Sequence, residues 1–123
     1  MKHAQISNIP DSPLEILLEA KNVSFNYHID ELWSKDNPDS WKRKPSKLSF
    51  EEAYELINPY NPHWGILYRD QEYITGGREK SYWEFGGCNL GTNGYGTVYM
   101  FIQVEVDKAE EIFKKHSLTI NKY

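Results

Sequence analysis

The segment from Thr97 to Val106 places the strongest constraint on the fold of this chain. Apolar residues occupy every second position, and aromatic or polar residues fill the positions between them: Val98, Met100, Ile102, Val104 and Val106 in one set, and Tyr99, Phe101, Gln103 and Glu105 in the other. A period of two sends side chains to opposite faces of a β-strand. The high apolar and aromatic content predicts a strand in a central position of a sheet.

Four other segments carry strand signals. Val23, Phe25, Tyr27 and Ile29 alternate with polar residues, which is typical of a strand. Three more strands are predicted, at residues 64–68, 72–75 and 80–85, with Gly76-Gly77 as the hairpin turn between the last two. Because the links between the later strands are short, we expect these strands to pair antiparallel.

Three capping signals predict three helices. Ser12-Pro13-Leu14-Glu15 predicts a helix over about 13–21, with Ser12 as the cap and Pro13 in the first helical position. Ser49-Phe50-Glu51-Glu52 predicts a second helix that ends near Asn58, because Pro59 disfavours helical geometry just before it. Asp107, followed by Glu110, predicts a third helix over about 108–116.

The order of these elements is α-β-α-β-β-β-β-α, without a βαβ series. This order predicts an α+β fold, with one mainly antiparallel sheet of about five strands and about three helices packed on it. A length of 123 residues fits a single domain over residues 1–123. We expect loosely held tails at residues 1–11 and 117–123, the second of which can add a short edge strand.

Composition narrows the classes of function. One cysteine excludes an internal disulfide, and the sequence has neither an apolar signal core nor a stretch long enough to span a bilayer, so we expect a cytoplasmic protein. The net charge of −4 disfavours direct binding to nucleic acid through its phosphates. An acidic protein is better suited to a cationic partner.

Five of the eight glycines lie in residues 86–96. Backbone N–H groups of a glycine-rich loop can surround an anion, which would suit a small-molecule or nucleotide-binding domain. The segment matches neither the Walker pattern nor the dinucleotide fingerprint, and a predicted strand follows it. The alternative interpretation is a long hairpin loop between two strands.

No complete catalytic or metal site is recognisable, and no cofactor is expected. Cys88 with His63 would make a cysteine-dependent enzyme if the two residues met in space, whereas an incidental thiol is the simpler interpretation. The four histidines lack the spacing of metal ligands. Neighbouring pairs such as Glu51-Glu52 lie in predicted first turns, where negative charge favours the helix.

The long predicted loop at residues 30–48 is unusual in a small domain, and its acidic part is a candidate binding surface. The candidate partner-binding residues are acids that supply charge and aromatics that supply anchors: Asp30, Glu31, Asp36 and Asp39, with Trp33, Trp83, Tyr95 and Tyr99. Core packing is the rival interpretation for the aromatics. The basic residues at 42–47 can contact phosphates or be neutralised by the acids before them.

These observations lead to three hypotheses of function. The first is a non-catalytic binding protein, such as an immunity protein that neutralises a cationic bacterial toxin nuclease. The second is a small-molecule or nucleotide-binding domain that uses the glycine-rich segment, and the third is a cysteine-dependent enzyme that uses Cys88. The lack of a catalytic set favours the first hypothesis.

Overall fold

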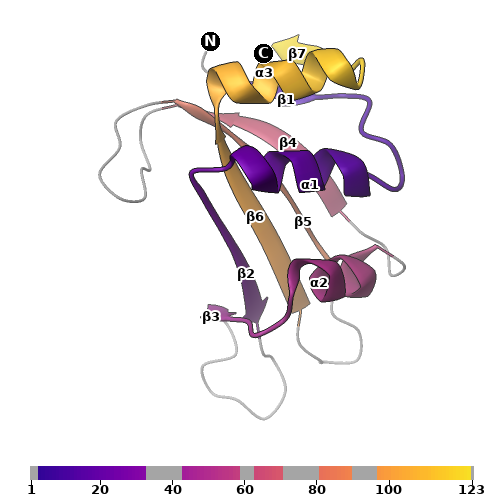
Figure 1. Ribbon diagram of the computed structural model, residues 1–123, viewed down its shortest axis with the longest axis vertical. Helices are drawn as coiled ribbons and strands as arrows, with labels where there is room; N and C mark the ends of the chain where they lie inside the picture. The colour runs from indigo at the N-terminus through magenta and orange to yellow at the C-terminus, as the bar shows by residue number, and fades with distance from the viewer. Residues whose placement is uncertain (1–2, 33–42, 59–62, 71–80, 90–96, 123) are drawn as a thin grey trace. The chain divides into compact units, whose positions relative to one another are not determined.

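The computed structural model describes residues 3–32, 43–58, 63–70, 81–89 and 97–122 (Figure 1). The helices are α1 (Leu14–Val23), α2 (Phe50–Ile57) and α3 (Val106–Lys115). The strands are β1 (Ala4–Ile6), β2 (Asn26–Leu32), β3 (Arg43–Pro45), β4 (His63–Arg69), β5 (Tyr82–Cys88), β6 (Thr97–Glu105) and β7 (Ile120–Lys122). The described strands form an antiparallel sheet in the order β3-β2-β6-β5-β4-β1-β7.

The α+β class and the antiparallel sheet are therefore confirmed. Strand β6 lies between β2 and β5, as its composition predicts. Val98, Met100, Ile102 and Val104 are all buried, whereas Tyr99 and Phe101 in the other phase are half-buried. The sheet has more strands than the five expected, because residues 4–6, 43–45 and 120–122 add short ones.

The chain divides into two compact units. Unit 1 comprises Met1–Tyr27, Gly65–Gly86 and Ile102–Tyr123, and unit 2 comprises His28–Trp64 and Gly87–Phe101. The boundaries fall inside β2, β4, β5 and β6, so each unit contains a part of these four strands.

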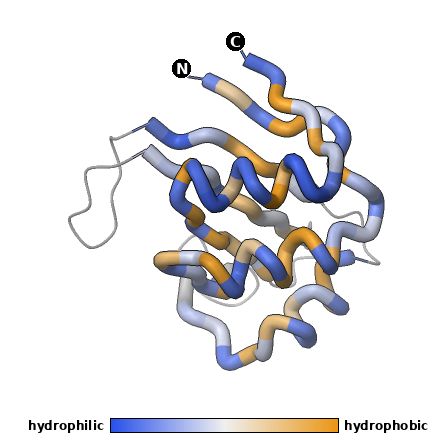
Figure 2. Tube along the Cα trace, turned by 45° about the horizontal axis from the view of Figure 1, so that its top comes forward, coloured by the Kyte–Doolittle hydropathy of each residue, from blue (hydrophilic) through white to orange (hydrophobic). Residues whose placement is uncertain are grey.

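Unit 1 is built around an aromatic core under α1 and α3, which lie side by side (Figure 1). The ring of Trp83 meets that of Phe113 edge to face, with centroids 4.8 Å apart, and Phe85 stacks on the same phenyl ring at 5.8 Å. All three side chains are buried. The surface of α3 toward the viewer in Figure 2 is largely hydrophilic, so this helix buries one apolar stripe and exposes the rest.

All three predicted helices are present, but two of the three predicted capping residues are wrong. Helix α1 begins at Leu14, with Pro13 rather than Ser12 in the N-cap position. Helix α3 begins at Val106 directly after β6, with Glu105 at the N-cap, so Asp107 lies inside the first turn rather than capping it. A strand that continues into a helix leaves no room for a separate capping residue. The charge of Asp107 still favours the N-terminal end of α3.

The first predicted strand is displaced, because α1 extends through Val23. The backbone N–H and the hydroxyl of Ser24 both donate to the carbonyl of Lys21, which ends the helix. Strand β2 therefore starts at Asn26 and reaches into the segment expected to be a loop. The predicted strand at 72–75 and its Gly76-Gly77 turn lie outside the described residues.

Both ends of the chain are paired in unit 1. Strand β1 pairs antiparallel with β4 and with β7. The side chain of Asn8 accepts a hydrogen bond from the Thr119 N–H at 2.7 Å and donates one to the Ser117 carbonyl at 3.0 Å. Residues 3–8 and 117–122 are thus tied to each other as well as to the sheet.

The turn after α3 is a Schellman motif. The N–H of Leu118 donates to the Phe113 carbonyl at 2.8 Å, and that of Ser117 donates to the Lys114 carbonyl at 3.3 Å. This motif needs a left-handed residue, and Ser117 supplies it with a φ of 54°. Glycine usually takes this position, because a Cβ atom is disfavoured at positive φ.

Unit 2 contains the helix that the sequence predicts best. Helix α2 starts with a complete capping box, in which Ser49 and Glu52 exchange two hydrogen bonds of 3.1 Å. It ends at the predicted Asn58, whose side chain accepts a bond from the Trp64 indole at 3.1 Å. The Trp64 ring also stacks on Tyr54, with centroids 5.5 Å apart.

Candidate functional site

The candidate site lies on the face of unit 2 that carries the odd-numbered residues of β6. Two contacts fix how β2 and β6 face each other. The Asn26 amide donates to the Gln103 side chain at 3.1 Å, and the His28 ring lies 5.9 Å from that of Phe101. Moving two residues forward along β2, from Asn26 to His28, therefore corresponds to moving two residues backward along β6, from Gln103 to Phe101. Asp30 is the next residue of β2 in this phase, and Tyr99 is the next residue of β6 in the phase of Phe101.

Asp30 and Tyr99, two of the residues singled out from the sequence, therefore share one face of the neighbouring strands β2 and β6. Successive pairs on one face of an antiparallel ladder are close enough for their side chains to interact. The ring of Tyr99 lies nearly parallel to that of Phe101, at 10° and a centroid distance of 6.0 Å. We call His28, Asp30, Tyr99 and Phe101 the Asp30 surface; all four residues are half-buried.

Glu31 belongs to the opposite phase of β2 and is engaged inside the unit. Its carboxylate accepts a hydrogen bond from the Ser46 hydroxyl at 3.0 Å. The β2–β3 register also pairs Glu31 with Lys44 and Asp30 with Pro45. The basic segment thus runs beside the acidic one, as the sequence suggested, and Glu31 is a weaker candidate than Asp30 for contact with a partner.

Trp83 has a core position. Its side chain has no exposed surface, and its ring packs between Phe113 and Tyr68. Its indole N–H is buried without a hydrogen-bond partner among the described residues. Trp83 is therefore a core residue, as the alternative to a partner-binding role for the aromatics proposed. In this conformation it cannot be an exposed anchor.

Four further candidates lie outside the described residues: Trp33, Asp36, Asp39 and Tyr95. They stay sequence predictions. On helix α2, Glu51 and Glu55 are exposed, and Leu56 is 41% exposed. Of these, only Glu51 was considered from the sequence, as a residue that favours the helix. Glu52 is occupied by its capping bonds, which lower the pKa of its carboxyl group.

The glycine-rich segment is partly a strand. Strand β5 continues through Gly86 and Gly87 to Cys88, so these residues do not belong to a loop, contrary to the prediction. The Asn89 side chain then accepts a hydrogen bond from the Val98 N–H at 2.7 Å and so connects the end of β5 to β6. Residues 90–96 lie outside the described part of the chain.

Cys88 is the last residue of β5, and its thiol is half-buried. Burial raises the pKa of its thiol above the ordinary value, which lowers the thiolate fraction at neutral pH. A catalytic cysteine needs the opposite shift. Its proposed partner His63 is the first residue of β4.

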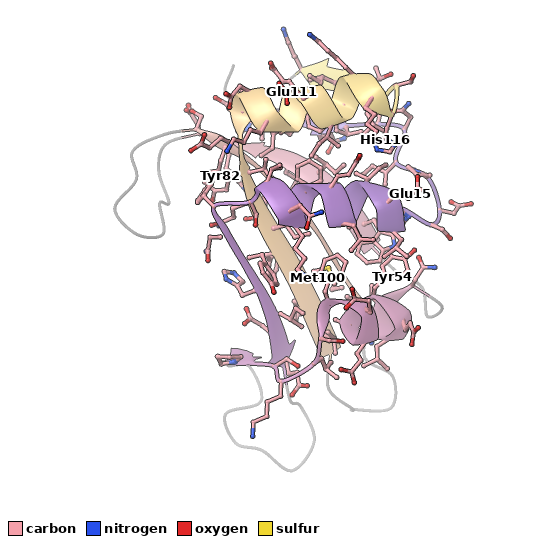
Figure 3. All side chains as sticks on the ribbon, viewed as in Figure 1. Glu15, Tyr54, Tyr82, Met100, Glu111 and His116 are labelled. Carbon is pink, nitrogen blue, oxygen red and sulfur yellow. The ribbon has the colours of Figure 1, made fainter. Side chains whose placement is uncertain are left out.

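The ionisable side chains of the described ranges do not gather into a metal site. No group of three or more His, Cys, Asp and Glu residues is placed to hold an ion there. His116 instead contacts the Glu19 carboxylate, which also pairs with Lys115. Figure 3 shows His116 at the end of α3 that lies beside the start of α1, where Glu15 is labelled.

Among the helices that the structure describes, none has the length and apolar character needed to cross a membrane. Comparison with protein-family models, with curated proteins and with solved structures finds no match.

Proposed function

We propose that this chain is a non-catalytic protein-binding domain that docks onto a cationic partner. Its concrete form is an acidic inhibitor of the immunity type, which neutralises a partner such as a bacterial toxin nuclease. The observation that supports the proposal is the Asp30 surface, where Asp30 and Tyr99 share one face of the neighbouring strands β2 and β6. A nuclease must bind phosphates, so it presents a basic cleft to which such a surface is complementary.

The distribution of charge supports the proposal. The chain carries 18 acidic and 14 basic residues. In unit 2, α2 adds the exposed Glu51 and Glu55, and this helix contains no lysine or arginine. Acidic residues around a site raise the rate of encounter with a basic protein. Half-buried tyrosine and phenylalanine rings supply the apolar contact that usually carries most of the binding energy.

The alternative functions have less support. The raised pKa of the Cys88 thiol opposes a cysteine-dependent enzyme. A small-molecule or nucleotide domain would rely on residues 86–96, of which Gly86 and Gly87 belong to β5. That hypothesis predicts that a metabolite raises the melting temperature of the protein.

The test is capture of partners from a lysate of the source organism with the tagged full-length protein, washed at low and at high salt. We expect a basic protein in equimolar amount that high salt removes. Charge reversal in Asp30→Lys should abolish capture. The matched control is Asp107→Lys, which reverses an exposed aspartate of unit 1 and should leave capture unchanged.

Two results would count against the proposal. One is the absence of a basic partner at both salt concentrations. The other is a partner whose capture survives Asp30→Lys, because such a partner would dock elsewhere on the chain.

A further inference from the structure

His116 lies where α1, α3 and the segment that leads into β7 meet in unit 1. It is the C-cap residue of α3, and its Nε2 atom contacts the carboxylate of Glu19 on α1. The other oxygen of that carboxylate pairs with Lys115. The imidazole is only 18% exposed, so water screens this contact less than it would at an open position. His116 therefore bridges the two helices (Figure 3).

Within this bridge of three residues, His116 is the one whose charge can change near neutral pH. The hydrogen bond from Lys115 is the main cause that lowers the pKa of the Glu19 carboxyl below its ordinary value of 4.5. The same hydrogen bond raises the pKa of Lys115 above its ordinary value of 10.5. Glu19 therefore stays negative and Lys115 stays positive between about pH 5 and 8, the range in which histidine ordinarily titrates.

The contact between His116 and Glu19 is stronger when the imidazole is protonated. A carboxylate only accepts hydrogen bonds, so Nε2 donates to it from either form of the ring, and the charged ring adds an electrostatic attraction. Lys115 repels that charge, but Glu15, one turn before Glu19 on α1, offsets the repulsion, since its charge also acts on Lys115. Two carboxylates and two cations then balance, and a cation is favourable at the C-terminal end of a helix.

The bridge stands at the start of the segment that closes the chain onto the sheet. Ser117 follows His116 and leaves the helix through the Schellman turn, with a φ of 54°. The amide of Asn8, which carries no charge, donates to the Ser117 carbonyl, and β7 pairs with β1. A displacement of His116 is therefore passed to residues 117–122 and, through Asn8, to residues 3–8.

We infer that His116 is a pH-sensitive clasp, whose protonation tightens the attachment of residues 3–8 and 117–122 to unit 1 and whose deprotonation loosens it. A contact that is stronger for the protonated ring adds stability that is fully present below the pKa of a histidine in an unfolded chain, about 6.5, and is lost as pH rises. At acidic pH, the clasp weakens again as pH falls through the lowered pKa of Glu19, because the neutral carboxyl no longer attracts the imidazolium. The attachment is therefore strongest in mildly acidic solution.

Hydrogen exchange of the full-length protein, followed by NMR, tests the clasp. The reporters are three backbone N–H groups with hydrogen bonds in this region, those of Ser7, Leu118 and Thr119. Each rate is divided by that of an unstructured peptide at the same pH, so that the ratio reports local opening. Between about pH 5.5 and 7.5 we expect protection to fall about threefold to tenfold, the scale of a charge contact at a helix end.

Three variants assign the effect to the bridge. His116→Gln keeps a side chain that can donate a hydrogen bond but cannot gain a charge, so protection should no longer fall over this pH range. Glu19→Gln removes the carboxylate and should also abolish the fall. The matched control is His3→Gln, which removes an exposed histidine of the same unit and should show the same fall as the parent protein. The spectrum of each variant shows whether it is folded.

Three results overturn the inference. The first is equal protection of the parent protein at the two pH values. The second is a fall that persists in His116→Gln or in Glu19→Gln, and the third is a fall that disappears in His3→Gln. These measurements involve no partner, so their outcome is independent of the proposed function.

Discussion

The two units use similar residues on the sheet in different ways. In unit 1, the carboxylate of Glu84 beside Tyr82 pairs with Arg69, so its charge is matched within the chain. In unit 2, Asp30 lies on β2 beside β6, which carries Tyr99, and the ion pairs between described residues do not include Asp30. A carboxylate that is matched internally contributes to the fold, whereas one that is not matched is available to a partner. The comparison therefore separates a structural cluster from a candidate binding site.

The aromatic residues show the same division. Trp83 is enclosed by the core of unit 1, and Phe113 packs against it. Tyr99 is half-buried beside Phe101 in unit 2. The sequence alone treats these two residues alike, because each is an aromatic residue in a predicted strand.

The largest expected effect is the difference in stability that results from replacing each of these two aromatic residues with alanine. Trp83→Ala should lower the free energy of unfolding by about 3–5 kcal/mol, because it empties a fully buried site. Tyr99→Ala should cost about 1 kcal/mol, the scale of one contact between half-buried rings. Urea denaturation followed by circular dichroism measures both losses. Equal losses would remove the distinction between a core aromatic and a surface one.

The second prediction concerns the turn that closes unit 1. Ser117→Gly should raise the free energy of unfolding by about 0.5–1 kcal/mol, because it removes the cost of a Cβ atom at a φ of 54°. Thermal unfolding measures the gain. Ser7→Gly, at an exposed position without a positive φ, is the control and should not stabilise the protein. A loss of stability in Ser117→Gly would show that its side chain matters more than its backbone.

The smallest effect concerns the contact between α1 and α3, where Glu19 pairs with Lys115 and His116. The hydrogen bond from Lys115 is the main cause that lowers the pKa of the Glu19 carboxyl below its ordinary value of 4.5, with a smaller contribution from His116. A carboxyl group whose pKa is lower in the folded state than in the unfolded state stabilises the folded protein. This contribution is fully present at pH values above the pKa of the unfolded state. That stability is lost as pH falls through the folded value.

Glu19→Gln should therefore be slightly less stable than the parent protein at neutral pH. The difference between the two should shrink as pH falls below 4.5. Thermal unfolding of both proteins across this range measures it. If the difference stayed constant at acidic pH, the contact would contribute through packing rather than charge.

Much of the fold could be predicted because its signals are local. The capping box at Ser49 and Glu52 needs only four residues, and the structure reproduces it. The phase of β6 follows from alternation alone. The start of α3 could not be predicted in the same way, because the strand passes directly into the helix and the apparent cap at Asp107 is displaced.

The candidate site depends on information that local patterns lack. Asp30 and Tyr99 could be selected one by one for charge and aromatic character, but their meeting depends on how β2 pairs with β6. The sequence does show that His28 and Asp30 share one face of their strand and that Tyr99 and Phe101 share one face of theirs. This alternation was a usable signal for the site. Only the contacts of Asn26 and His28 across the ladder turn it into a register.

We propose that unit 2, through Asp30, forms the surface that meets a cationic partner. The most direct measurement is the affinity of the captured partner for the parent protein, for Asp30→Lys and for Asp107→Lys, by isothermal titration. If Asp30 meets the partner, Asp30→Lys loses binding while Asp107→Lys retains it. Equal affinity for all three proteins would show that the binding surface lies elsewhere on the chain.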